Sequence, residues 1–357
     1  MPPDTSVKKV LIYRLGSLGD TVVALPCFHL IARAYPNAER RLLTNFPVHA
    51  KAPASAAVLG DSGLVHGYMR YTVGTRRVNE LLHLAWEIHR FRPDVLVYLM
   101  PVRPLKHVQR DRLFYRLAGV RRFVGIPGEE ELKNRYDPMT GLYESEASRL
   151  ARALVGLGDA HPENIANWDL RLNAAEREAA ARALSGVAGK NLIVCGPGTK
   201  IQSNDWERDN WRALLGRLYT KYPSYGLVMI GAKEDAAVCE YTAQDWGGVK
   251  LNLTGKLSPR ESAAVLSLAT VFIGPDSGPK HLAASVGVPC VCAFSARCLP
   301  GKWFPPGKRN IILYHQTECA DCGLETCIAM EKKCIRSVTV DEMEDAVERV
   351  LSQWVQP

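Results

Sequence analysis

Short, largely apolar runs alternate along this chain with segments in which apolar residues recur at helical spacing. Uniformly apolar runs that end in turns are typical of parallel strands buried on both faces. The predicted strands include residues 9–13, 94–100, 191–195, 227–230, 271–273 and 290–294. The predicted helices include 21–34, 78–89, 174–184, 208–221, 234–246 and 258–268. Strands and helices that alternate with short connections predict α/β architecture with doubly wound parallel sheets.

The alternation occurs twice, and the two series are separated by a polar, irregular stretch that begins at residue 127 and includes three consecutive glutamates. A chain of 357 residues also exceeds what a single core usually holds. We therefore predict two Rossmann-like domains, residues 1–165 and 174–338, that face a central cleft where a ligand binds at the strand ends.

Basic residues are concentrated in one part of the chain. Between Arg70 and Arg122 there are twelve Lys or Arg against four Asp or Glu, and this excess equals the net charge of +8 of the whole protein. Such a field suits an anionic partner, namely a phosphorylated lipid or sugar, a membrane surface or a nucleic acid. Within it, the loop and helix that follow strand 94–100 provide the candidate contacts Arg103, Lys106, Arg110 and Arg112.

The loop after the first strand carries an acid, Asp20, at the point where open α/β sheets place their ligands. Its glycine spacing is neither the dinucleotide motif nor the phosphate loop of nucleotide hydrolases. A helix-capping aspartate is the alternative interpretation, because Asp next to Thr21 at a helix start is common.

A second loop, between strands 271–273 and 290–294, begins with Gly-Pro-Asp-Ser-Gly-Pro and leads into a helix of small residues. Asp276 or Ser277 can cap this helix, and Gly278 leaves the backbone amides accessible. A helix start of this kind favours an anionic group, although an ordinary α/β turn would have the same pattern.

Four cysteines, Cys319, Cys322, Cys327 and Cys334, lie within sixteen residues. They predict a structural metal site, either zinc or an iron–sulfur cluster, or else a staple of free thiols or disulfides, with a local role far from the chemistry. The other six cysteines lie in apolar segments and are expected in the core. The beginning of the chain lacks the apolar stretch of a signal peptide, and no run is long enough to span a membrane, so we expect a cytoplasmic protein.

Three separated motifs resemble glycosyltransferase family 9, the ADP-heptose lipopolysaccharide heptosyltransferases. Residues 11–26 read LIYRLGSLGDTVVALP, residues 196–200 read GPGTK with two tryptophans behind them, and residues 276–283 read DSGPKHLA. The motifs occur in the family's order and span nearly the whole chain. The resemblance implies a GT-B fold and inverting, metal-independent transfer of a sugar, in this case heptose from ADP-heptose, with no cofactor required for catalysis.

The resemblance also implies roles for individual residues. Asp20 matches the proposed general base, and a carboxylate at this position would remove the proton of the acceptor hydroxyl. His281 matches a family histidine, with a histidine satisfied in the core as the alternative. The expected donor-binding residues are Thr199, Lys200, Glu234, Leu257, Asp276, Ser277, Gly278 and His281. In GT-B proteins the final helix often crosses back to the first domain, and the amphipathic segment within 339–357 could do so.

The chain departs from the family where other members have a lysine before the first loop tryptophan, because Asn204 stands there and Lys200 is our candidate replacement. The expected acceptor is an anionic glycolipid or oligosaccharide such as lipopolysaccharide core, reached by peripheral contact with the cytoplasmic face of the inner membrane, and not a nucleic acid. A sugar-nucleotide epimerase of the same fold and a non-catalytic nucleotide-sugar-binding protein are the alternatives.

Overall fold

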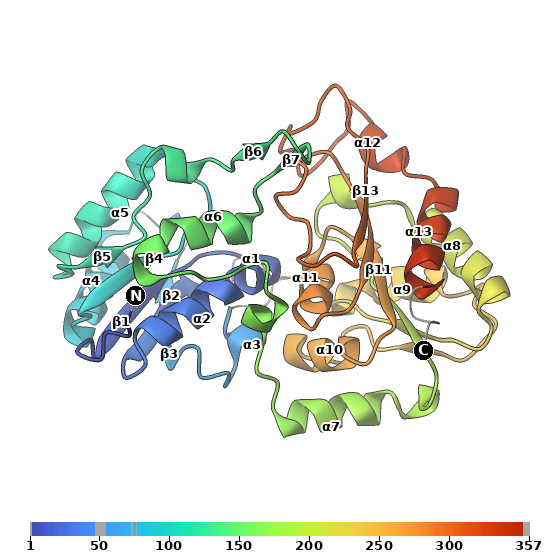
Figure 1. Cartoon of the computed structure of the whole chain (residues 1–357), viewed down its shortest axis with the longest axis horizontal. Helices are drawn as coiled ribbons and strands as arrows, with labels where there is room; N and C mark the ends of the chain where they lie inside the picture. Colours follow the sequence, from blue (N-terminus) through green and yellow to red (C-terminus); the bar gives the residue numbers. More distant parts are fainter. Residues whose placement is uncertain (1, 47–54, 73, 76, 353–357) are drawn as a thin grey trace. The chain divides into compact units, whose positions relative to one another are not determined.

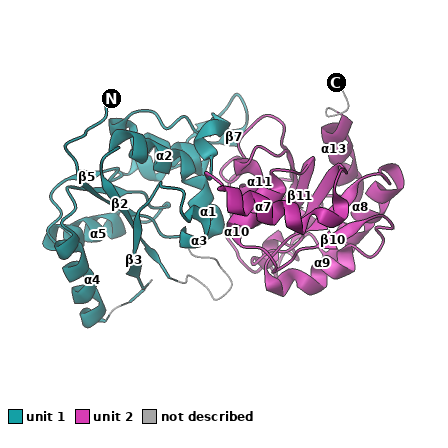
Figure 2. Cartoon of the chain, turned by 90° about the horizontal axis from the view of Figure 1, so that it is seen from below, with its two compact units in different colours: residues 1–170 teal, residues 171–357 magenta. Residues whose placement is uncertain are grey.

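The structure is a computed structural model that describes residues 2–46, 55–72, 74–75 and 77–352. The predicted terminal segment therefore extends beyond the described residues at 353–357, and the basic residue Arg76 also lies outside them. The chain divides into two compact units, Met1–Leu170 and Arg171–Pro357 (Figure 2). The division falls between the two predicted domains, the first ending at 165 and the second beginning at 174.

Unit 1 is built on a parallel sheet of five strands in the order β3-β2-β1-β4-β5 (Figure 1). The strands are β1 (Lys9–Tyr13), β2 (Glu39–Asn45), β3 (Gly67–Tyr71), β4 (Val95–Tyr98) and β5 (Phe123–Val124). The order reverses between β1 and β4, so the chain winds away from the centre in both directions. The right-handed crossovers that parallel strands require therefore place the helices on both faces of the sheet.

The helices of unit 1 are α1 (Leu18–Val23), α2 (Leu25–Ala34), α3 (Ser55–Leu59), α4 (Val78–Phe91), α5 (Leu105–Leu117) and α6 (Glu146–Ala153). The inner faces of α4 and α5 pack on alternate residues of the sheet, including Leu11, Tyr13 and Leu96. The expected irregular stretch holds α6 and a small antiparallel hairpin, β6 (Tyr136–Asp137) and β7 (Leu142–Tyr143). Short 3-10 helices are η1 (Glu130–Leu132), η2 (Val155–Leu157) and η3 (Ile165–Trp168).

Unit 2 has a parallel sheet of six strands in the order β10-β9-β8-β11-β12-β13. The strands are β8 (Leu192–Cys195), β9 (Gly226–Met229), β10 (Lys250–Asn252), β11 (Val271–Pro275), β12 (Cys290–Phe294) and β13 (Ile311–Tyr314). Strand β13 was not predicted, and it differs from β11 and β12 because all four of its residues are only half-buried. The predicted α/β class with two doubly wound parallel sheets is confirmed.

The helices of unit 2 are α7 (Ala174–Ala183), α8 (Arg208–Lys221), α9 (Ala236–Thr242), α10 (Pro259–Leu266), α11 (Gly278–Ser285), α12 (Lys333–Arg336) and α13 (Val340–Ser352). Its 3-10 helices are η4 (Ser185–Val187), η5 (Gln202–Asn204) and η6 (Lys233–Asp235). The helix expected over 234–246 is thus shorter and begins with a 3-10 turn. In the described part of the chain, no helix is both long and apolar enough to cross a bilayer.

The final helix, α13, uses its apolar face inside unit 2. Met343, Val347 and Leu351 join the same buried cluster as the tryptophans of the loop after β8 and of α8. Glu344 binds Lys221 of α8 at 2.8 Å and Arg217 at 3.2 Å. The apolar residues of the described helix therefore complete the core of unit 2, and its crossing back to the first domain stays a prediction.

Replacement of Met343 by Ala should test this packing, because Met343 is fully buried in the unit 2 core. We expect the cavity to lower the free energy of unfolding of unit 2 by about 2–5 kcal/mol. Urea unfolding followed by tryptophan fluorescence reports on this core, since Trp206, Trp211 and Trp246 are buried in it. Met139→Ala is the matched control because Met139 is 91% exposed, and equal effects of the two variants would contradict the assignment.

Candidate functional site

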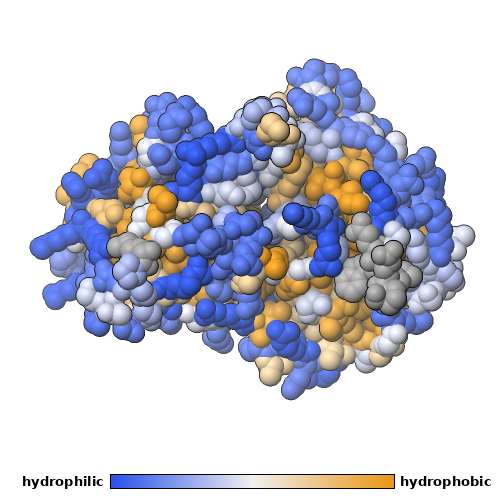
Figure 3. All heavy atoms as spheres, in the orientation of Figure 1, coloured by the Kyte–Doolittle hydropathy of each residue, from blue (hydrophilic) through white to orange (hydrophobic). Residues whose placement is uncertain are grey.

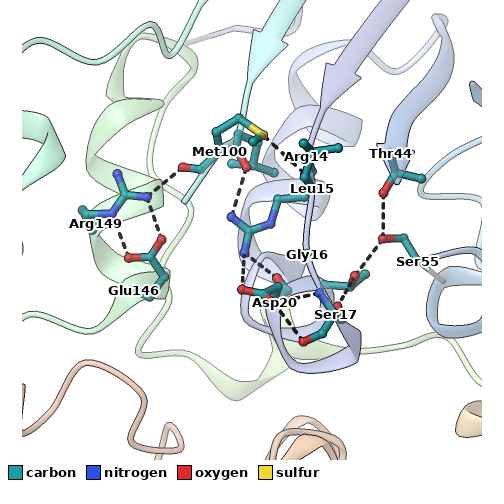
Figure 4. A network of polar contacts seen from close by, with 12 residues as sticks. Arg14, Leu15, Gly16, Ser17, Asp20, Thr44, Ser55, Met100, Glu146 and Arg149 are labelled. Carbon is teal, nitrogen blue, oxygen red and sulfur yellow. Dashed lines mark hydrogen bonds and ion pairs between the residues drawn. The ribbon is translucent and has the colours of Figure 1, made fainter. Parts of the chain in front are cut away.

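The loop from β1 to α1 holds Asp20 in a fixed position (Figure 4). Asp20 Oδ2 accepts hydrogen bonds from the backbone N–H of Ser17 at 2.8 Å and from the Ser17 hydroxyl at 2.9 Å. Gly16 has a φ of +151°, and a Cβ there would lie 2.3 Å from the Cβ of Asp20, so only glycine fits. Asp20 thus makes hydrogen bonds at the start of α1, as the helix-capping interpretation predicts. Its side chain is nevertheless 25% exposed and accessible to a reactant.

A buried arginine that the sequence analysis did not select supports this loop. Arg14 is fully buried, and its guanidinium donates to the carbonyl oxygens of Leu99 at 3.1 Å and Asp20 at 2.7 Å. Its Nη2 also lies 3.7 Å from Asp20 Oδ1. Burial lowers the pKa of the Arg14 guanidinium, and the negative charge of Asp20 opposes this shift. A single basic residue at the end of an apolar strand was the signal that could have indicated it.

A second buried arginine holds the end of β4 beside Arg14 (Figure 4). Arg149 donates to Glu146 through two nitrogens, at 2.7 and 2.8 Å, and to the carbonyl oxygen of Met100 at 2.9 Å. Both members of this ion pair are 1% exposed. Consecutive carbonyls after β4 are therefore bound by Arg14 and Arg149, which positions the β4 end next to the loop that carries Asp20.

The predicted acceptor contacts lie on α5 and in the loop before it. They differ in exposure and in whether an acidic side chain pairs with them. Arg103 Nη1 lies 2.5 Å from the buried carboxylate of Asp111, which also accepts from Tyr98 at 3.0 Å. Arg110 contacts the other oxygen of Asp111 at 3.1 Å but is largely exposed. Lys106 and Arg112 are exposed. Arg103 thus has a structural partner that the sequence pattern did not indicate.

In unit 2, the predicted donor-binding residues follow strands that run in parallel, so they share the carboxyl edge of one sheet. Thr199 and Lys200 follow β8, Glu234 follows β9 in η6, Leu257 follows β10, and the segment 276–281 follows β11. Lys200 and Glu234 are exposed and Leu257 is half-buried. The Thr199 hydroxyl is engaged in a local turn, where it accepts from the N–H of Ile201 at 3.2 Å.

Lys280 holds the loop after β11 in place. It is fully buried, and its ammonium donates to Asp276 Oδ1 at 2.8 Å and to the carbonyl oxygen of Trp303 at 2.5 Å. The same Nζ lies 4.7 Å from the ring centroid of Phe294. The Asp276 carboxylate is therefore paired within the protein, which assigns it to shaping the loop more than to direct ligand contact.

Asn204 connects three loops at this edge. Its amide nitrogen donates to the carbonyl oxygen of Asp276 at 3.0 Å, and its Oδ1 accepts from the Ser295 hydroxyl at 2.5 Å. Asn204 is 1% exposed, so the residue that replaces the family's lysine has an internal structural role. The carboxylate of Asp235, next to the predicted Glu234, packs directly against the backbone of Gly198. A Cβ added at Gly198 would lie only 2.3 Å from that carboxylate.

The start of α11 is half-buried and carries an unsatisfied hydroxyl. Ser277 is the residue before the helix, and its side chain makes no capping hydrogen bond. Among the described residues, its buried Oγ has no hydrogen-bond partner. The first N–H groups of a helix also have no acceptor within the helix. Gly278 begins the helix, and His281 lies in its first turn with its ring centroid 6.2 Å from that of Trp303.

The four-cysteine segment reaches the loops that shape this site. Leu324 provides its carbonyl oxygen to the Ser203 hydroxyl at 2.7 Å and to Arg297 at 2.7 Å, and the N–H of Cys327 donates to Gln202 at 2.8 Å. Ser203 directly precedes Asn204. The backbone of this segment therefore braces the loop whose Asn204 binds Asp276, so the segment lies nearer to the predicted donor-binding residues than we expected.

The same cysteines do not form a metal centre in this structure. Cys319, Cys322, Cys327 and Cys334 are free thiols, and only Cys322 is exposed. No group of three or more His, Cys, Asp or Glu within the described ranges is arranged to hold a metal ion. Burial raises the pKa of the Cys334 thiol, and the nearby Cys319 and Cys327 add to this effect. The zinc hypothesis thus finds no support, and the four thiols are unpaired in this structure.

Comparison with known proteins places these features in a family. The profile of glycosyltransferase family 9 (heptosyltransferase) matches residues 147–333, which is more than half of the chain. Lipopolysaccharide heptosyltransferase 3 of Escherichia coli is 30% identical over 111 residues, which cover 30% of this chain and 32% of that protein. The match therefore spans about a third of the length of that relative.

Two solved structures have the same fold over nearly their whole length. A family 9 glycosyltransferase from Veillonella parvula matches with a TM-score of 0.71 and 17% identity, covering 97% of this chain and 98% of that one. The ADP-heptose lipopolysaccharide heptosyltransferase II of E. coli matches with a TM-score of 0.67 and 15% identity, covering 97% and 99%. The predicted GT-B fold and the predicted family are both confirmed. The protein belongs to glycosyltransferase family 9 (heptosyltransferase).

Proposed function

We propose that this protein is an inverting glycosyltransferase that transfers heptose from ADP-heptose to an anionic glycolipid or oligosaccharide, such as lipopolysaccharide core. One observation carries the proposal: a partly exposed carboxylate, Asp20, is held by Ser17 at the carboxyl end of β1 in a family 9 chain. The donor assignment draws on the family match and on the E. coli relative named for ADP-heptose.

In the proposed reaction, Asp20 takes the proton of an acceptor hydroxyl while that oxygen bonds to the anomeric carbon of the sugar. The bond from that carbon to the donor phosphate breaks, and its electrons leave with ADP. Attack from the face opposite the phosphate inverts the anomeric centre. The carboxylate is suited to this role because its second oxygen, Oδ1, accepts no hydrogen bond from the described residues. Oδ1 lies 3.7 Å from Nη2 of Arg14.

The negative charge that develops on ADP needs positive groups in unit 2. We assign this role to the start of α11, at Ser277 and Gly278, and to the exposed Lys200, and not to a metal ion. The N-terminal end of a helix favours phosphate through its N–H groups and dipole. The remaining donor contacts in this proposal are Thr199, Glu234 and Leu257, at the ends of β8, β9 and β10.

His281 would act in this site as a neutral imidazole. It is 7% exposed, and burial lowers the pKa of its ring well below 6.5, with the adjacent Lys280 contributing. A neutral ring can donate or accept a hydrogen bond at neutral pH without bringing a charge next to the Lys280 ammonium. We propose it as a donor-binding residue on this basis.

The proposed acceptor is lipid-linked, so we place the enzyme on the cytoplasmic face of an inner membrane as a peripheral protein. The exposed Lys106, Arg110 and Arg112 are the proposed contacts for acceptor phosphates or carboxylates, with Arg103 positioned behind them by Asp111.

The donor proposal is tested by incubating the protein with ADP-heptose, GDP-sugars or UDP-sugars and a heptose-deficient lipopolysaccharide acceptor. We expect transfer from ADP-heptose, an inverted linkage in the product, and the same rate when EDTA is present. Preference for a UDP-sugar would overturn the heptose assignment. Loss of transfer in EDTA, restored by a divalent metal, would overturn the metal-independent part.

Asp20→Asn should lower the transfer rate by about 10²- to 10⁴-fold, because the amide cannot take the hydroxyl proton. Binding of ADP-heptose, measured by calorimetry, should stay near the wild-type value. Ser17→Ala is the control, since it removes one hydrogen bond to Asp20 but keeps the carboxylate. A wild-type rate in Asp20→Asn would show that Asp20 only caps α1.

Ser277→Ala should weaken ADP binding by about 10- to 100-fold if the unsatisfied hydroxyl binds a phosphate oxygen. The melting temperature should not fall, because the hydroxyl has no partner among the described residues. Ser295→Ala serves as the contrast, since its hydroxyl binds Asn204 and its loss should lower stability. Unchanged ADP affinity in Ser277→Ala would remove this residue from the proposed site.

The buried His281 should make the stability of unit 2 depend on pH. Below a pH of about 6.5 the unfolded chain protonates this ring, whereas the folded chain does not, so the free energy of unfolding falls as pH falls. We expect His281→Gln to reduce this decrease by up to about 1.4 kcal/mol per pH unit. Urea unfolding at about pH 7.5 and about pH 5.5 measures it, and equal slopes for both proteins would contradict a neutral buried ring.

A further inference from the structure

Two neighbouring helices of unit 1 expose apolar side chains that the core does not use. Val78, Leu82 and Trp86 recur every fourth residue on α4 and are 68%, 64% and 53% exposed. On α5, Leu113 and Leu117 are 60% and 80% exposed. The helices lie side by side, as Figures 1 and 2 both show. Their opposite faces are already buried against the sheet, so the outer apolar residues have no role in the described core.

The same part of the chain is rich in basic side chains. From residue 77 to residue 122 the described chain has ten Lys or Arg against four Asp or Glu, and one of those acids, Asp111, is buried and paired. The exposed arginines of this region are Arg77, Arg90, Arg92, Arg110, Arg112, Arg116, Arg121 and Arg122. In the left part of Figure 3, over unit 1, hydrophobic patches lie among hydrophilic residues.

A small basic pocket lies at the end of the α4 stripe. It has a volume of about 290 Å³, and its lining includes Lys9, Arg41, Trp86, Arg90 and Phe91. Aromatic faces hold its cations: Arg41 and Lys9 lie 4.5 and 5.4 Å from the Phe91 ring centroid, and Arg90 lies 5.4 Å from that of Trp86.

Two acids accompany this pocket without cancelling its charge. Glu39 pairs with Arg41 at 2.6 Å, and Glu87, in the lining, lies 3.8 Å from His83. The three basic side chains of the pocket therefore exceed these two acids by one charge. The pocket is separate from the candidate active site, because Lys9 begins β1 whereas Asp20 follows the end of that strand.

We propose that the outer faces of α4 and α5 dock on an anionic bilayer surface and that this pocket takes a lipid headgroup phosphate. Apolar side chains would enter the interfacial region, where Trp is favoured, while arginines would bind headgroup phosphates around them. The charge excess favours this partner over an uncharged protein surface. The proposal rests on the proposed function only in explaining why docking is useful, since it would bring the enzyme to a lipid-linked acceptor.

Co-sedimentation of the full chain with phosphatidylcholine vesicles, with or without phosphatidylglycerol, tests this docking surface. We expect binding only to the anionic vesicles and weaker binding in high salt. The double variant Leu82→Ser, Trp86→Ser should bind at least about tenfold more weakly, because two apolar side chains no longer leave water. Arg90→Glu should weaken binding about tenfold. Ile328→Ser is the matched control, because Ile328 is 78% exposed but lies in unit 2.

Tryptophan fluorescence gives an independent readout. Anionic vesicles should shift the emission of the wild-type protein to shorter wavelength, and Trp86→Phe should lose this shift while keeping most of its vesicle binding. Melting temperature and ADP binding should match the wild type in every variant, which separates this proposal from the proposed catalytic function. Absence of wild-type binding to anionic vesicles, or wild-type binding by the double variant, would overturn the proposal. Equal binding to both vesicle types would overturn the headgroup pocket.

Discussion

The position of each candidate site loop depends on one fully buried cation. Arg14 in unit 1 and Lys280 in unit 2 have no exposed surface, and a buried charge is tolerated only when nearby oxygens satisfy it. Those oxygens belong to the loops that carry the proposed chemistry: Arg14 binds the carbonyl of Asp20, and Lys280 binds the carboxylate of Asp276. Displacement of either loop would remove one of the few partners of a charge buried in a medium of low dielectric constant, which favours a fixed loop position before a ligand arrives.

Close backbone approaches reinforce this positioning. Gly16 and Gly198 have no room for a side chain, because an aspartate presses on each of them. Asn204 then ties the loops after β8, β11 and β12 together, and the segment around Leu324 supports the neighbouring Ser203. The amide of Asn204 therefore joins these loops from inside the protein.

The sequence was sufficient for features that depend on local pattern. Apolar runs identified most strands, and their parallel alternation placed Asp20 and Ser277 at carboxyl ends of β1 and β11. It was insufficient for partnerships between residues distant along the chain. Nothing local to Arg14 indicates that it binds a carbonyl 85 residues away, and the contact from Ser203 to Leu324 spans 121 residues. The pairing of Arg103 with Asp111 joins residues that are closer in sequence. The sequence alone does not determine which basic side chain of that loop contacts the acid. Strand β13 was missed although residues 311–314 are an apolar run like those that identified the other strands.

The packing of α13 also determines the order in which the protein can fold during synthesis. Unit 1 is formed by residues up to Leu170, so its sheet can close while later residues are still being made. Unit 2 begins at Arg171, but its core includes Val347 and Leu351. Its nascent sheet must therefore wait, with the tryptophan-lined surface uncovered, until synthesis has passed residue 351.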